Sequence, residues 1–139
     1  MTTVDLARAY LDQARIRLDL LAELRRRGAW NDVVRFAQEA VELALKALLR
    51  HAAIDPPKAH DVGPALLGAA SRLPPAAAAR CAEFARISTA LAASRGPAFY
   101  GNEAAGVPAS QLFGTAEADN AEQLARKVVE GVTTIMSAP

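Results

Sequence analysis

Cysteine and histidine are scarce in this chain, and their scarcity excludes two kinds of site. The single cysteine, Cys81, cannot form an intramolecular disulfide, and we expect it to be a small buried core residue. The only histidines are His51 and His60, and they lack the ligand spacing of a metal centre. We therefore expect neither a bound metal nor another cofactor.

Aromatic residues make up only 5% of the 139 residues, and strand-like runs of alternating β-branched residues are absent. Hydrophobic residues nevertheless make up 52%, so the core has to be built from alanine, leucine and valine. This composition favours closely packed helices over sheet. We expect one all-α domain over residues 1–139, long enough to bury a core without disulfides or metal.

Net charge and long apolar runs are also limited. A formal charge of +1 argues against a protein that holds long nucleic acid by electrostatics alone, although a local basic patch remains compatible with it. No uninterrupted apolar run reaches the ~18 residues of a membrane span, and the first ten residues lack the apolar core of a signal peptide. The expectation is a cytoplasmic protein without a membrane partner.

The stretch from Asp32 to Arg50 predicts the helix against which the other helices pack. At about 100° per residue, its charged side chains fall within one narrow stripe, which comprises Asp32, Arg35, Glu39, Glu42, Lys46 and Arg50. Nearly all the remaining residues are Ala, Val, Leu or Phe. A helix that is apolar over most of its circumference has neighbouring helices on several sides, so the charged stripe should face water or a cleft.

Apolar periodicity predicts the other helices. They cover about residues 3–27, a short segment after Asp61, about residues 76–93, and a last helix that starts near Thr115 or Asp119. Asn31 or Asp32 is expected to cap the central helix. The buried seam of the first helix is predicted to be Val4, Ala7, Leu11, Ala14, Leu18 and Leu21.

Residues 94–114 break this periodicity, with four glycines and two prolines. Long segments without periodicity are uncommon in small compact domains and are more often functional or mobile than filler. We expect a loop here.

Three segments together carry a resemblance to a known family. They are the central helix AQEAVELALKALL with Glu39 and Lys46, the segment PPKAHDVGPALL with His60, and the segment SRGPAFYG with Arg95 and Tyr100. In this order, over roughly residues 30–131, the chain resembles a HEPN (higher eukaryotes and prokaryotes nucleotide-binding) domain. The resemblance implies an up-and-down antiparallel bundle of four to five helices and a symmetric homodimer whose cleft gathers polar residues from both copies.

The resemblance implies two functional branches. Many HEPN proteins are metal-independent endoribonucleases, often toxins silenced by a neighbouring minimal nucleotidyltransferase, and their mark is an arginine followed within a few residues by a histidine. Others lack this mark and are nucleotide- or RNA-binding modules or accessories of the nucleotidyltransferase. In this chain Arg95 matches the family arginine. The next position, which is polar in the family motif, is occupied by Gly96, and Tyr100 occupies the position where the histidine is expected.

This departure decides how we interpret the segment. Proton transfer in RNA cleavage needs a group with a pKa near the working pH, whereas the pKa of tyrosine is about 10. An arginine guanidinium can still bind a phosphate group through its planar set of N–H donors. We interpret Arg95 as a phosphate ligand and Tyr100 as a hydrogen-bonding or base-stacking phenol; a helix-terminal cation and a buried aromatic are the alternatives. His60 is either a catalytic group or part of a capping cluster.

The sequence therefore predicts a homodimeric binding module that works with a minimal nucleotidyltransferase in a toxin-antitoxin-like pair. The residues expected to line its cleft for a nucleotide or single-stranded RNA are Arg95, Tyr100, Asn102, Glu39 and Lys46. One alternative is a metal-independent endoribonuclease with a degenerate motif, whose candidate catalytic residues are Arg95, Tyr100 and His60. Another is a dimerisation adaptor without a ligand.

Overall fold

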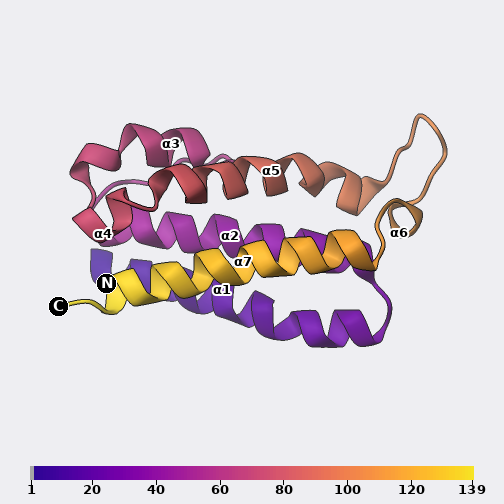
Figure 1. Ribbon diagram of the computed structural model, residues 1–139, viewed down its shortest axis with the longest axis horizontal. Coiled ribbons are helices and arrows are strands. Elements are labelled where there is room, and N and C mark those ends of the chain that lie inside the picture. The colour runs from indigo at the N-terminus through magenta and orange to yellow at the C-terminus, as the bar shows by residue number, and fades with distance from the viewer. Residues whose placement is uncertain (1) are drawn as a thin grey trace.

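The computed structural model describes residues 2–139 and arranges them around four long helices (Figure 1). These are α1 (Thr3–Arg26), α2 (Trp30–His51), α5 (Cys81–Tyr100) and α7 (Thr115–Ser137). The shorter elements are α3 (Gly63–Gly68), the 3-10 helix η1 (Ala70–Arg72), α4 (Pro75–Ala78) and α6 (Ala109–Leu112). Residues 2–139 contain no strand, and consecutive long helices run in opposite directions. The predicted all-α, up-and-down bundle is confirmed.

The central position of α2 is confirmed as well. This helix packs against α1, α5 and α7, and none of its residues is exposed. Its apolar side chains fill the core, and Leu45, Leu48 and Leu49 are completely buried. The charged stripe is half-buried rather than solvated, because the neighbouring helices close over both of its sides.

The hairpin between α1 and α2 departs from prediction at two places, Val4 and the cap of α2. The cap of α1 is Thr2, whose hydroxyl accepts a hydrogen bond from Asp5 N–H, and Val4 in the first turn is 54% exposed instead of buried. Gly28 follows the end of α1 with φ +68°, a conformation that glycine adopts without strain.

The start of α2 also differs from prediction, because neither Asn31 nor Asp32 caps it. The helix already begins at Trp30, and the Asn31 amide donates a hydrogen bond to the carbonyl of Ala98 at 3.1 Å.

The end of α5 contradicts the predicted loop over residues 94–114. The helix continues through Pro97 to Tyr100, because packing supports its last turn: Ala98 is fully buried and its carbonyl receives the Asn31 amide. Gly101 then ends the helix at φ +74°, a position where a Cβ would lie 2.3 Å from the carbonyl oxygen of Val107. The irregular segment thus begins at Gly101.

Between α5 and α7 the chain forms a tight turn and the short helix α6. Asn102 and Val107 exchange two backbone hydrogen bonds of 2.8 and 2.9 Å, and the turn projects from the end of the bundle (Figure 1). Helix α7 begins at Thr115, and its first turn is closed by a bond from Gly114 N–H to Glu117. Asp119 is therefore not a cap.

The corner before α3 is fixed by α5. The buried hydroxyl of Ser88 accepts a hydrogen bond from Val62 N–H at 2.9 Å, and the Thr89 hydroxyl donates to the Asp61 carboxylate at 3.0 Å. Asp61 also accepts from Gly63 N–H at 2.9 Å. The contacts of Asp61 and Val62 hold the backbone that follows His60 against α5. None of the described helices is long and apolar enough to cross a membrane.

The buried position of α2 makes a prediction about stability. Leu45→Ala should lower the free energy of unfolding by about 2–5 kcal/mol, because it removes a completely buried side chain and leaves a cavity. The same substitution at Leu20, which is 44% exposed on α1, should cost less than about 1 kcal/mol. Urea denaturation followed by circular dichroism measures both; equal losses would contradict the fold described here.

Candidate functional site

One carboxylate on α2 gathers arginines from three helices. The Oε1 atom of Glu39 lies 3.1 Å from Arg17 Nε of α1, and its Oε2 atom lies 3.2 Å from Arg35 Nε of α2. Arg95 of α5 approaches Oε2 to 3.6 Å. Three guanidinium groups are thereby held close together against a single negative charge, so they leave an excess of positive charge at this face.

A buried amide orients Arg95. Gln38 is only 2% exposed, and its Oε1 accepts a hydrogen bond of 2.7 Å from Arg95 Nη1, while its Nε2 donates to Glu42 at 3.0 Å. Because both ends of the amide are bonded, Gln38 has little freedom to turn. The bond from Nη1 uses one of the five N–H donors of the guanidinium. Sequence reasoning missed Gln38, since a lone amide among apolar residues gives no pattern.

Glu42 links this network to a lysine and a histidine. Its Oε2 lies 2.9 Å from Lys46 Nζ, and its Oε1 lies 2.9 Å from His60 Nδ1. Burial favours the neutral acid, but the hydrogen bonds from Gln38, Lys46 and His60 outweigh it and lower the pKa of Glu42 below its ordinary value. The carboxylate therefore stays charged and fixes one nitrogen of the His60 ring.

A hollow of about 370 Å³ opens between α5, α2 and the loop before α3. Its walls are Arg35, His60, Ala92, Arg95, Gly96 and Tyr100. Ala92, Gly96 and Tyr100 follow one another at intervals of four along α5, so the two small residues leave room between the larger side chains. The continuation of α5 past Pro97 is what brings Tyr100 to this wall.

The hollow, which we call the polar cavity, unites the three candidates Arg95, Tyr100 and His60. Tyr100 is 64% exposed, which excludes the alternative of a buried aromatic. Arg35 adds a second guanidinium that sequence reasoning had only counted as part of the charged stripe. Its Cζ lies 4.3 Å from the centroid of the Phe99 ring, another residue that was missed.

Three residues predicted to line the cleft lie outside this wall. Glu39 bonds the arginines, and Lys46, which is almost covered, bonds Glu42. Asn102 accepts a hydrogen bond from Ala105 N–H through its side chain and so closes the turn after α5. Their contacts make Glu39 and Lys46 supports of the polar cavity and make Asn102 a support of the turn.

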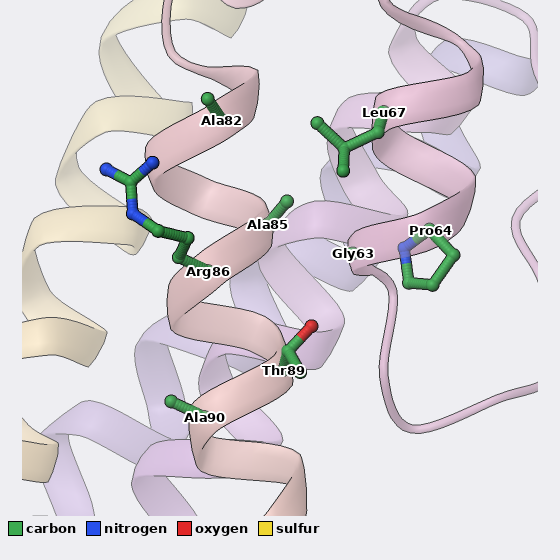
Figure 2. A pocket seen from close by; sticks show the side chains of 8 residues that line it. All are labelled: Gly63, Pro64, Leu67, Ala82, Ala85, Arg86, Thr89 and Ala90. Carbon is green, nitrogen blue, oxygen red and sulfur yellow. The ribbon is translucent and has the colours of Figure 1, made fainter.

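A larger hollow of about 510 Å³ lies elsewhere, between α3 and α5 (Figure 2). Leu67 extends from α3 toward Ala82 and Ala85, so that the surface between the two helices is almost entirely apolar. The one hydroxyl on it, that of Thr89, is bonded to Asp61. Apart from Thr89 and the Arg86 guanidinium, the residues that line this groove are apolar, so we place the candidate functional site at the polar cavity, where two guanidinium groups lie beside a histidine and a tyrosine.

Cys81 does not line the polar cavity. The thiol of Cys81 is buried and donates to the Leu66 carbonyl at 3.8 Å, and burial raises its pKa, which makes it unreactive. Within residues 2–139, no three His, Cys, Asp or Glu side chains come together as metal ligands.

Comparison with known families identifies the family to which this helical fold belongs. The model of the HEPN domain matches residues 7–136, almost the whole chain. The chain belongs to the HEPN domain family. No curated protein and no solved structure matched it. Within the HEPN bundle, Arg95 and Tyr100 occupy neighbouring turns at the end of α5, and His60 faces the same hollow from another part of the chain.

The charge of Glu42 makes a prediction about pH. Because its pKa is lower in the folded protein than its ordinary value of 4.5, the carboxylate stabilises the fold above that pH and loses this contribution as the pH falls through the folded value. The difference in unfolding free energy between wild type and Glu42→Gln should thus be larger at pH 7 than at pH 3. Glu103→Gln, in the exposed turn, serves as the control and should change stability little at either pH. A Glu42→Gln deficit that is unchanged by pH would contradict the network.

Proposed function

We propose that this HEPN domain binds a nucleotide or RNA through a phosphate held in the polar cavity. The observation that carries the proposal is the pair of guanidinium groups, Arg35 and Arg95, on the wall of one hollow with His60 and Tyr100. Arginine presents a planar fork of donors that matches phosphate oxygens. Here the buried Gln38 orients the Arg95 guanidinium and the half-buried Glu39 orients that of Arg35 before a ligand arrives.

The local charge supports an anionic ligand. Four cations (Arg17, Arg35, Arg95 and Lys46) share two carboxylates, Glu39 and Glu42, in this network. The surplus is positive although the whole chain carries a formal charge of only +1. The attraction is thus local to one face, which suits a short segment of phosphate backbone better than a long duplex.

Family membership supports two further parts of the proposal. HEPN domains commonly form symmetric dimers, and we propose a homodimer that places two polar cavities in one particle and works with a minimal nucleotidyltransferase in a toxin-antitoxin-like pair. Sedimentation analysis tests the first part, and copurification of the nucleotidyltransferase tests the second.

Arginine substitutions test the phosphate site. Arg95→Ala and Arg35→Ala should each weaken binding of a short RNA by about ten- to a hundredfold, the effect of a charged hydrogen-bonding group, and lower the salt dependence of binding. Arg86→Ala removes the same charge from an exposed position of α5 and should leave affinity nearly unchanged. Fluorescence anisotropy with labelled RNA measures all three. Equal affinity of Arg95→Ala and wild type would mean that the ligand binds elsewhere.

Metal-independent RNA cleavage is a second candidate function, and the contact between His60 and Glu42 favours it. A carboxylate that holds Nδ1 at 2.9 Å leaves Nε2 for proton transfer. His60 would take the proton of a 2′-hydroxyl as that oxygen attacks the phosphorus, and the protonated ring would return it to the leaving 5′-oxygen. The histidine missing at position 100 would thus be supplied from the segment before α3.

This alternative has its own test. In EDTA, wild-type protein should cleave a labelled RNA pool to products with 2′,3′-cyclic phosphate ends, and His60→Gln should lose the cleavage while it still binds RNA. Binding without cleavage by wild type leaves the protein as a binding module. Cleavage that His60→Gln retains would exclude His60 as the base.

A further inference from the structure

Two large aromatic side chains stand exposed beside the polar cavity. Phe99 and Tyr100, the last two residues of α5, are 57% and 64% exposed. The other large hydrophobic residues with high exposure lie on α1 and α3, so this aromatic pair is a separate feature. Adjacent exposed aromatic rings cost solvation free energy, and such surfaces are typical of binding sites.

The two rings are held in a fixed arrangement. Their centroids are 4.7 Å apart and their planes meet at 83°, the edge-to-face geometry that aromatic pairs favour. The Arg35 guanidinium covers the Phe99 ring at 4.3 Å from its centroid and is itself bonded to Glu39. Arg35, Phe99 and Tyr100 thus form one continuous cluster, which we call the aromatic ledge.

The aromatic ledge and the polar cavity share two residues. Arg35 belongs to the cluster and to the cavity wall, and Tyr100 combines an exposed ring with the same wall. A ligand whose phosphate lies between Arg35 and Arg95 therefore has an aromatic surface within reach of its neighbouring group. A nucleobase has the flat π-face that stacks on such a ring, whatever its identity.

We propose that the ligand is single-stranded RNA of which one unpaired base stacks on Tyr100 while the adjoining phosphate is gripped by Arg35 and Arg95. This inference rests on the proposed function and narrows its ligand class. Duplexes are disfavoured because their bases are already stacked inside the helix. An apolar protein partner is disfavoured because it would remove water from the Arg35 and Arg95 guanidinium groups. These groups share the single Glu39 carboxylate with Arg17, so their positive charge is only partly balanced.

The test compares three RNA probes. An eight-nucleotide oligouridine and the same strand without bases carry equal numbers of phosphates, and a duplex of eight base pairs carries twice as many. Fluorescence anisotropy should show wild-type protein binding oligouridine about tenfold more tightly than the abasic strand, the usual effect of one stacked base. Tyr100→Ala should remove this preference, whereas Tyr100→Phe should keep it. Phe99→Ala should weaken it, because the Tyr100 ring loses its support.

Two results would overturn the inference. If wild-type protein bound oligouridine and the abasic strand equally well, no base would stack on Tyr100 and the inference would be wrong. If Arg95→Ala still weakened the binding of both probes, the proposed phosphate site would nevertheless be supported. A change in sedimentation of Tyr100→Ala without any change in probe preference would make the aromatic ledge a protein interface. Failure of wild type to bind any probe would instead reject the proposed function. The comparison within wild type does not depend on the folding of a variant.

Discussion

The burial of α2 is the constraint on which the rest of the structure depends. A helix covered by α1, α5 and α7 leaves its charged groups only partly in contact with water, so a charge there without a partner would destabilise the fold. Glu39 is therefore paired with Arg17 of α1 and Arg95 of α5, and Glu42 is bonded to Lys46 of the same helix and to His60. The ion pairs and hydrogen bonds of these two carboxylates also place guanidinium groups and an imidazole ring around one hollow.

The last turns of α5 bring Arg95 and Tyr100 next to this charged network. Had the helix stopped at Ala93, Arg95 and Tyr100 would belong to a loop with no fixed relation to each other. The Asn31 amide and the burial of Ala98 hold the last turn in place despite Pro97. Arg95 then meets Gln38 and Tyr100 faces the same hollow, so the fold brings together groups from helices that are distant in sequence.

The fold could be predicted almost completely, because helical periodicity reports burial directly. The seams of the long helices and the charged stripe followed from it. The details that were wrong are Val4, Asn31 and the helix predicted over about residues 76–93, whose first part is divided between α4 and α5. The end of α5 could not be predicted, since Gly96 and Pro97 are locally unfavourable to a helix and only tertiary contacts outweigh them. For the same reason the residues around the polar cavity were predicted only in part. Arg95, Tyr100 and His60 stood out as residue types, whereas Gln38, Arg35 and Phe99 are identified only by their contacts.

The most direct test of this account is a titration of isotopically labelled protein with a short single-stranded RNA, followed by NMR. The polar cavity predicts shifts concentrated at the amides of Ala92, Gly96 and Tyr100 and at the side-chain Nε–H groups of Arg35 and Arg95. Shifts centred on Gly63, Leu67 and Ala82 would place the ligand in the apolar groove instead and contradict the assignment of the site.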